Sequence, residues 1–498
     1  MNIRKFQNVD LKGKRVLLRV DYNVPMKDGK IAEDSRIVQT LPTIEKLLKQ
    51  NARLIICSHM GRPEGKNVPS MSMNPIAQYL SKLLKKPVKT MKDCVGSEVQ
   101  KAAAALKPGE ILFLENLRFH LEEEKNDPKF ARELASLAEV FVSDSFATAH
   151  RAHASTAGVT KYLPSYAGFL MQHEVAELSS ITEKPAKPLT VIVAGAKIDT
   201  KIGIIENFLK KADTFLVGGG LANTFLAAEG YNVGKSLYEP DKLEVAQDTL
   251  IAAEQLHIGF ILPEDVIVAD EIKDDATTID IPVDDVIGEM KILDIGSKSI
   301  QKFAQIIKDS KTVIWNGPVG LSEMKPFSKG TAAIAQTLVS AKGVKSILGG
   351  GDTVEAVKRL GFGEDQFTFV STGGGAMLEF LEGKVLPGVE VLMEKGAKSS
   401  PAKKATPKKK VAAKKKKAVS KKKKPTLKKK AVAKKKPVAK KKPVTKKKST
   451  SKKKPAGKKK QSKAMPKKKT GTKKVIKKMK GKKTVKTKKP MKKSKKRR

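Results

Sequence analysis

The sequence predicts an α/β protein with two doubly wound parallel-sheet domains, separated by a cleft and joined by a helix, and a disordered C-terminal tail. Short apolar runs alternate with amphipathic stretches of helical spacing, a pattern typical of parallel sheets built from βαβ units. Charge separates the tail from these domains. Residues 398–498 hold 52 Lys and Arg and no Asp or Glu, whereas the first 397 residues hold 49 basic and 51 acidic residues.

The predicted strands are continuous apolar runs, as expected for strands buried on both faces. They lie at 15–20, 54–58, 111–114 and 140–143 in the first half, and at 189–193, 214–217, 312–315 and 367–371 in the second. Helical spacing is found at 37–50, 75–86 and 167–182, and the last of these is followed by Pro185 and Pro188. We therefore expect a first domain over 1–169, a connecting helix or linker over 170–186, and a second domain over 187–379.

Charged residues follow each strand of the first half. They are Asp21, His59, Arg62, Arg118, His120, His150, Arg151 and His153, and the polar Asn23 lies beside Asp21. Because ligands of open α/β sheets bind at the carboxyl ends of the strands, these residues and Arg36 predict one basic pocket. Arginine donates in a planar, bidentate geometry, which suits a small anion with phosphate and carboxylate groups. Each residue alone is equally consistent with a surface charge or a helix cap, but repetition after four strands favours the pocket.

Glycines follow the strands of the second half. They occur in AGAK (194–197) and in the triplets 218–220, 349–351 and 373–375. Glycines before a helix allow backbone N–H groups to approach a phosphate, where the helix N-terminus adds partial positive charge. Lys197 and Lys201 are four residues apart and can reach the same phosphates, and Asp352 is a candidate Mg²⁺ ligand. Neither a GxxxxGK[ST] nor a GxGxxG sequence is present, which excludes a P-loop and a dinucleotide fingerprint.

The remaining signals predict a cytoplasmic protein. Cys57 and Cys94 belong to no metal spacing and no CxxC pair, so we expect two reduced thiols. The first ten residues are polar and lack the apolar stretch of a secretory signal. No apolar run reaches the ~18 residues of a membrane span, so no transmembrane segment is expected.

The motifs that contain these residues resemble those of the phosphoglycerate kinase family, in order, from about residue 2 to 396. They include RVDYNVP (19–25), SHMGRPEG (58–65), LENLRFH (114–120), DSFATAHRAHAS (144–155), GGGLANTF (218–225), WNGPVG (315–320), GGGDT (349–353) and STGGGAMLE (371–379). The resemblance implies reversible, Mg²⁺-dependent phosphoryl transfer between 1,3-bisphosphoglycerate and ADP, giving 3-phosphoglycerate and ATP in glycolysis. It also implies a monomer whose two domains close on each other, and a segment 380–396 that returns to the first domain.

The resemblance assigns a role to each matching position. Substrate binding is implied for Asp21, Tyr22, Asn23, Arg36, His59, Met60, Gly61, Arg62, Arg118 and Arg151. Nucleotide binding is implied for Gly195, Ala196, Lys201, Gly219, Ile292, Asn316, Glu323, Gly350, Gly351, Asp352 and Thr353, with Mg²⁺ on Asp352. Catalytic roles are implied for Arg36, Lys197, Lys201, Gly351 and Gly374. Three features depart from the family. Ala194 and Ile292 stand where it usually has glycine, and Ile292 can reshape the nucleotide pocket. The stretch SDSFA (143–147) stands where the family usually has an NDAFG-like sequence.

The segment 397–498 consists mainly of Lys, Pro, Ala, Val, Thr and Ser. Frequent prolines, like charges and few apolar residues predict disorder. A polycation binds polyanions through counterion release with little sequence selectivity, and this composition is similar to that of linker-histone tails. Nonspecific DNA or RNA binding is therefore the leading expectation. An anionic membrane surface, polyphosphate, the ribosome or no partner at all remain alternatives.

Two other functions compete with the active kinase. One is a catalytically idle body that caps a DNA-binding polycation, and the other is a kinase for a different small carboxylate. An idle body is expected to have lost charged positions of the motifs, yet Arg36, Lys197, Lys201 and Asp352 are all present. A different carboxylate would need a different anion pocket, so the motif set favours phosphoglycerate kinase activity.

Overall fold

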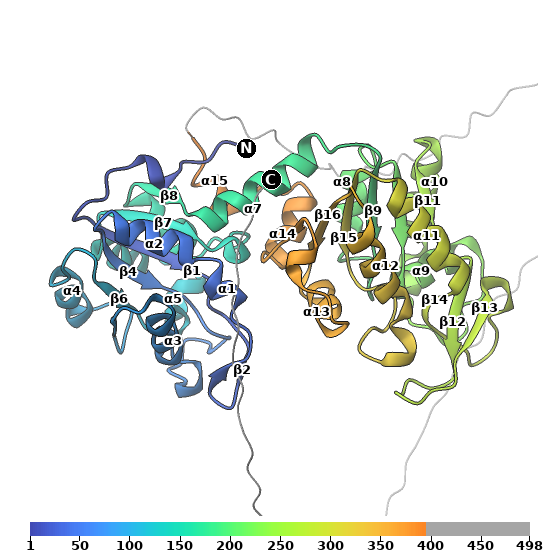
Figure 1. Cartoon of the computed structure of the whole chain (residues 1–498), viewed down its shortest axis with the longest axis horizontal. Helices are drawn as coiled ribbons and strands as arrows, with labels where there is room; N and C mark the ends of the chain where they lie inside the picture. The colour runs from blue at the N-terminus through green and yellow to red at the C-terminus, as the bar shows by residue number, and fades with distance from the viewer. Residues whose placement is uncertain (395–498) are drawn as a thin grey trace, which may run out of the picture. The chain divides into compact units, whose positions relative to one another are not determined.

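The structure is a computed structural model, and it describes residues 1–394. Two six-stranded parallel sheets with flanking helices dominate these residues (Figure 1), which confirms the predicted fold class. The predicted disorder of 397–498 lies outside the described residues. Within residues 1–394, no helix is both long and apolar enough to span a membrane.

The first sheet has the strand order β5-β6-β4-β1-β7-β8, and every pairing in it is parallel. Its strands are β1 (Arg15–Val20), β4 (Arg53–Cys57), β5 (Val88–Thr90), β6 (Ile111–Phe113), β7 (Val140–Asp144) and β8 (Ser165–Ala167). Its helices include α1 (Ser35–Val38), α2 (Leu41–Lys49), α3 (Asn74–Leu84), α4 (Ser97–Ala104), α5 (Leu121–Glu124) and α6 (Pro128–Ser136). A small hairpin joins β2 (Met26–Lys27) to β3 (Lys30–Ile31).

Strand β1 shows why apolar residues run continuously in this sheet. Val16, Leu18 and Val20 belong to one buried cluster, whereas Leu17 belongs to another. Successive side chains of a strand point to opposite faces, so both faces of the sheet are covered. The helix predicted at 37–50 divides into α1 and α2, with Pro42 in the first turn of α2, where proline is tolerated because no N–H is needed.

Helix α7 (Phe169–Glu183) connects the first sheet to the second. The second sheet has the order β11-β10-β9-β15-β16-β17. Its strands are β9 (Leu189–Val193), β10 (Thr214–Val217), β11 (Gly259–Ile261), β15 (Thr312–Asn316), β16 (Lys345–Gly349) and β17 (Phe369–Val370). Its helices are α8 (Ile202–Phe208), α9 (Gly219–Glu229), α10 (Leu243–Gln255), α11 (Ser297–Asp309), α12 (Lys329–Ser340), α13 (Gly351–Arg359) and α14 (Gly375–Leu381).

An additional antiparallel sheet was not predicted. It consists of β12 (Asp265–Ala269), β13 (Ile279–Pro282) and β14 (Lys291–Ile295), in the order β13-β12-β14. Strand β13 is an edge strand whose residues are mostly exposed, so it lacks the continuous apolar run that marked the other strands. The sheet adds a wall beside the parallel sheet, and this wall lines part of the cavity described below.

The last described residues contact the beginning of the chain. After α15 (Pro387–Glu390), the carbonyl of Leu392 accepts from the N–H of Arg4 at 2.8 Å, and the N–H of Glu394 donates to the carbonyl of Asn2 at 3.2 Å. The N–H of Gly388 donates to the carbonyl of Ala149 at 2.8 Å, in the segment that follows β7. Backbone hydrogen bonds therefore join this segment to the first domain.

Candidate functional site

The predicted anion-binding residues follow four neighbouring strands of the first sheet, in the order β6-β4-β1-β7. Asp21 follows β1, His59 follows β4, Arg118 follows β6, and Arg151 follows β7. All four strands are parallel, so their carboxyl ends meet at one edge of the sheet. The structure thus places these residues at the same edge, as the sequence predicted.

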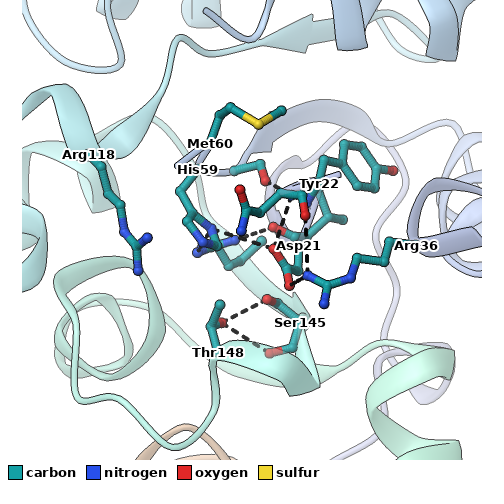
Figure 2. A network of polar contacts seen from close by, with 12 residues as sticks. Asp21, Tyr22, Arg36, His59, Met60, Arg118, Ser145 and Thr148 are labelled. Carbon is teal, nitrogen blue, oxygen red and sulfur yellow. Dashed lines mark hydrogen bonds and ion pairs between the residues drawn. The ribbon is translucent and has the colours of Figure 1, made fainter. Parts of the chain in front are cut away.

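Asp21 lies between a cation and an imidazole (Figure 2). Its Oδ2 accepts from Nη1 of Arg36 at 2.5 Å, and its Oδ1 is 3.6 Å from Nδ1 of His59. Asp21 is only 7% exposed. Nη1 of Arg36 also approaches the carbonyl of Asn23 at 3.4 Å. Arg36 is therefore oriented by the residues that follow β1, and a charge-assisted bond to a buried carboxylate is stronger than a neutral one.

Arg118 is buried and fixed from two sides. Its Nη1 donates to the carbonyl of Gly61 at 2.7 Å, and its Nε is 3.1 Å from Oε1 of Glu124. Burial is the main cause that lowers the pKa of the guanidinium. Asn116 connects the two loops, because its Oδ1 accepts from the N–H groups of both Met60 and Arg118.

His150 and Arg151 form a second contact at this edge. Nε of Arg151 donates to Nε2 of His150 at 3.1 Å. Burial and then Arg151 lower the pKa of His150, which agrees with an imidazole nitrogen that accepts. His120 instead contacts Asp93, with Nε2 at 2.7 Å from Oδ1.

The family resemblance implies substrate binding for Tyr22 and Met60, but their side chains do not face a ligand at this sheet edge. The ring of Tyr22 is fully buried, packs against Phe113 and bonds through Oη to Oγ1 of Thr40 at 2.6 Å. Burial raises the pKa of Tyr22 strongly. Met60 also belongs to the buried cluster around β1. At Tyr22 and Met60, only backbone groups are available to bind a ligand. The side chain of Arg62, in contrast, is exposed.

The second domain contains a cavity of about 270 Å³. Six residues implied in nucleotide binding line it: Gly195, Ala196, Gly219, Ile292, Glu323 and Asp352. Aliphatic and proline side chains make up much of the remaining wall, including Leu237, Pro263, Val266, Pro318, Val319 and Leu321. An apolar cleft with a few polar groups suits a flat, partly apolar ligand.

The glycine loops that line this cavity pack backbone against backbone. A Cβ on Gly219 would lie 2.9 Å from both N and O of Gly195, and a Cβ on Gly317 would lie 2.0 Å from the carbonyl oxygen of Ala194. Both glycines have positive φ, +65° and +96°. Side chains are therefore excluded at these positions by space as well as by conformation.

Lys201 is partly buried, and its Nζ bonds to Oδ1 of Asn316. Burial lowers the pKa of Lys201, while the charge of Asp352 opposes this effect. Nδ2 of Asn316 donates to the carbonyl of Gly349 at 2.6 Å, and Oγ1 of Thr353 accepts from the N–H of Gly317 at 2.7 Å. Asn316 and Thr353 thus tie together the ends of β15 and β16. Neither residue lines the cavity itself.

The remaining predicted residues lie at loops and helix starts. Gly350 caps α13, Gly351 begins it, and Gly374 precedes α14. Lys197 is exposed, in contrast to Lys201. Sequence reasoning did not single out Arg19, Glu123 and Ser155, which are buried behind the first site. A signal for Arg19 was available, because it is a charged residue inside the otherwise apolar run RVLLRV.

Comparison with known proteins identifies the family. The family model "Phosphoglycerate kinase" matches residues 6–384. The chain belongs to the phosphoglycerate kinase family. The phosphoglycerate kinase of Dictyoglomus turgidum is 49% identical over 393 residues, covering 79% of this chain and 99% of that protein. That of Chloroherpeton thalassium is 51% identical over 395 residues, with 79% and 99% covered.

A solved phosphoglycerate kinase structure from Coxiella burnetii matches with a TM-score of 0.72 and 44% identity, covering 78% of this chain and 98% of that one. The likeness to phosphoglycerate kinases therefore extends over nearly their whole length. The lysine-rich segment lies beyond the residues matched by the family model.

Proposed function

We propose that the two domains catalyse reversible phosphoryl transfer between 1,3-bisphosphoglycerate and ADP, giving 3-phosphoglycerate and ATP. The observation that carries this proposal is that His59, Arg118 and Arg151 follow strands that end at one sheet edge, in a chain of this family. The ion pair with Asp21 brings Arg36 to the same edge. Cations and neutral imidazoles at a single edge suit a small substrate with one phosphate and one carboxylate. The reaction belongs to glycolysis, and we place it in a cytoplasmic monomer.

The proposed substrate site uses side chains. Arg118 and Arg151 bind the phosphate that stays on the substrate, together with the exposed Arg62. Asp21 accepts from a substrate hydroxyl and, with the carbonyl of Asn23, orients Arg36 toward the carboxyl end. Asn23 is itself positioned, because its Oδ1 accepts from the N–H of Gly61 at 2.8 Å.

The proposed nucleotide site uses backbone groups and apolar walls. The base and ribose occupy the 270 Å³ cavity, with Glu323 as the ribose acceptor and Ile292 against the base. The phosphates meet Lys201, Thr353 and the N–H groups of Gly350 and Gly351 at the beginning of α13. Asp352 fits a Mg²⁺ ion, because a single carboxylate at a phosphate site supplies the kind of hard oxygen ligand that this ion prefers. When bound, Mg²⁺ would neutralise phosphate charge.

Transfer needs positioned charge and no nucleophilic side chain from the protein. The carboxylate oxygen of 3-phosphoglycerate attacks the γ-phosphorus of ATP, the bond to the β-phosphate bridge breaks, and ADP leaves. Arg36 and Lys197 stabilise the phosphoryl group in transit, and the N–H groups near Gly374 add donors. The exposed Lys197 is free to follow the moving group. Because these groups belong to different domains, the domains must close for transfer.

The test is a coupled assay of 3-phosphoglycerate-dependent ATP turnover, on the full chain and on a variant that ends at residue 396. We expect turnover in both forms. The absence of turnover in both would reject the proposal and favour a catalytically idle body.

We also propose that residues 397–498 bind DNA or RNA without sequence selectivity. The supporting observation is their composition of 52 basic and no acidic residues over 398–498. Residues 398–498 contain no aromatic residue for base stacking and little Arg for base readout. Their affinity must therefore come from attraction between lysine side chains and the phosphates of the nucleic acid. In filter-binding titrations, we expect affinity that falls steeply with salt and disappears when the segment is removed. Equal affinity of the truncated chain would contradict this proposal, as would a strong preference for anionic vesicles or polyphosphate.

A further inference from the structure

One charged side chain is buried within strand β1. Arg19 is 1% exposed. Its Nε donates to Oγ of Ser155 at 2.8 Å, and its Nη2 lies 3.2 Å from Nδ1 of His59. Its Nη1 also bonds to the carbonyl of Val20. The guanidinium therefore connects the imidazole behind Asp21 to a serine in the segment that follows β7.

The other end of this connection is a buried carboxylate. Glu123 in α5 is 1% exposed, and both of its oxygens bond to Ser155. Oε1 accepts from Oγ of Ser155 at 2.6 Å, and Oε2 accepts from its N–H at 2.9 Å. A hydroxyl has one hydrogen. Because that hydrogen is donated to Glu123, Oγ of Ser155 must accept from Arg19. The donor and acceptor of each hydrogen bond between Glu123, Ser155 and Arg19 are therefore fixed.

His153 does not compete strongly for this carboxylate. Its Nδ1 is 3.9 Å from Oε1 of Glu123, too far for a hydrogen bond. Burial and then Arg118 lower the pKa of His153 to about 3, so the imidazole is neutral near pH 7. The serine, and through it Arg19, is left as the principal partner of Glu123.

The contact with Arg19 determines which nitrogen of His59 carries the proton. Arginine has five N–H donors and no acceptor, so Nδ1 of His59 must accept from Arg19. The 3.6 Å separation from Oδ1 of Asp21 is too long for Nδ1 to donate there instead. Burial, followed by the charges of Arg19 and Arg118, lowers the pKa of His59 well below its usual value. A neutral imidazole with an accepting Nδ1 carries its proton on Nε2.

We propose that Glu123 and Ser155 are positioning residues that act through Arg19 to hold His59 as the neutral Nε2–H tautomer. The Nε2–H group is then the donor that His59 offers to the bound anion. This inference rests on the proposed function for its substrate, because His59 is expected to contact 3-phosphoglycerate. Neither Glu123 nor Ser155 touches the substrate in this account.

The tautomer is tested directly by long-range ¹H–¹⁵N NMR on full-length protein with ¹⁵N-labelled histidine, with His59→Gln used for assignment. In the wild type we expect an unprotonated Nδ1 and a protonated Nε2 for His59. In Glu123→Gln and Ser155→Ala we expect the two nitrogen signals to move toward each other, as both tautomers become populated. Glu122→Gln is the matched control, because Glu122 is an exposed carboxylate on the same helix, and it should leave the signals unchanged.

Kinetics supply the second readout. Because a hydrogen bond to a charged group contributes appreciably to binding, we expect the KM for 3-phosphoglycerate to rise about tenfold or more in Glu123→Gln. The KM for MgATP should stay the same in that variant, and Glu122→Gln should match the wild type. Unfolding midpoints for each variant show whether the protein remains folded. Glu123→Gln keeps the shape of the side chain, and is therefore informative even if Ser155→Ala does not fold.

Three results would overturn the inference: a wild-type His59 protonated on Nδ1, a Glu123→Gln variant with unchanged His59 signals, or equal increases in both KM values. Failure of the proposed function is distinguishable from these results. If the wild type shows no 3-phosphoglycerate-dependent turnover, the substrate is wrong, while the NMR spectra still decide the tautomer.

Discussion

The two candidate sites differ in the chemical groups that form them. At the edge of the first sheet, charged side chains are held by hydrogen bonds, such as those of Arg36 to the buried Asp21 and of Arg118 to the carbonyl of Gly61. In the second domain, the cavity is formed by apolar walls and by glycine loops in backbone contact. A small, highly charged anion needs directed charge, whereas a nucleotide offers a large apolar surface and phosphates that bind to N–H groups. Mutations should therefore damage the two sites in different ways.

The largest expected effect is the loss of Arg36. In Arg36→Ala, 3-phosphoglycerate-dependent turnover should fall about a hundredfold or more, because a preorganised charge near the reacting atoms is removed. Steady-state kinetics with both substrates measure this loss. Arg359→Ala is the control, since Arg359 is paired with a single surface carboxylate, Glu355, at 2.7 Å. Activity of Arg36→Ala within threefold of this control would contradict the assigned role.

In the second domain, an added methyl group should be destructive where the backbone is crowded. We expect Gly317→Ala to lower the free energy of unfolding by about 2 kcal/mol or more, through positive φ and the clash with Ala194. Gly343→Ala isolates the conformational part, because Gly343 has φ +79° but nothing within 4 Å of its added Cβ. That variant should lose about 1 kcal/mol. Equal losses in urea denaturation would show that the close approach is unimportant.

A third effect concerns pH and the first domain. Burial raises the pKa of Asp144 from 3.8 to about 7. Between these values the folded state holds a proton that the unfolded state has released, so stability should fall as pH rises, by up to about 1.4 kcal/mol per pH unit. In Asp144→Asn this slope should become smaller, as measured by urea denaturation from pH 4.5 to 7.5. Part of it should remain, because burial also raises the pKa of Glu174 and of Asp294 to about 7. Asp248→Asn, at an exposed position, should keep the full slope of the wild type. An equally steep slope in Asp144→Asn would refute the assignment.

The smallest expected effect is at Ile292, which lines the cavity. Removing three carbons in Ile292→Ala should raise the KM for MgADP by about tenfold or less, since each buried methylene contributes about 0.8 kcal/mol and the pocket is only partly closed. The KM for 1,3-bisphosphoglycerate should not change. Ile279→Ala is the matched control, because Ile279 lies on β13 of the same sheet and is 53% exposed. An unchanged KM for MgADP would place the base elsewhere.

Most strands that are buried on both faces were predictable, although the fully buried β12 was missed. β1 and β10 have the predicted bounds, 15–20 and 214–217, because each is a short apolar run that ends in turn residues. β13 was missed because an exposed edge strand has no such run. In the first site, residues after the strands were predictable, since parallel strands end at a common edge. The burial of the Tyr22 ring and the bond between Glu123 and Ser155, 32 residues apart, depend on tertiary contacts that spacing along the chain does not reveal.

The central claim is that the chain transfers a phosphoryl group between ATP and the carboxylate of 3-phosphoglycerate. The most direct measurement is to incubate the full chain with MgATP and 3-phosphoglycerate in hydroxylamine, which traps acyl phosphates, and to quantify ADP and hydroxamate. The account predicts equal amounts of both products, and neither when 3-phosphoglycerate is omitted or replaced by glycerate. ADP release without hydroxamate, or equal reaction with glycerate, would contradict it.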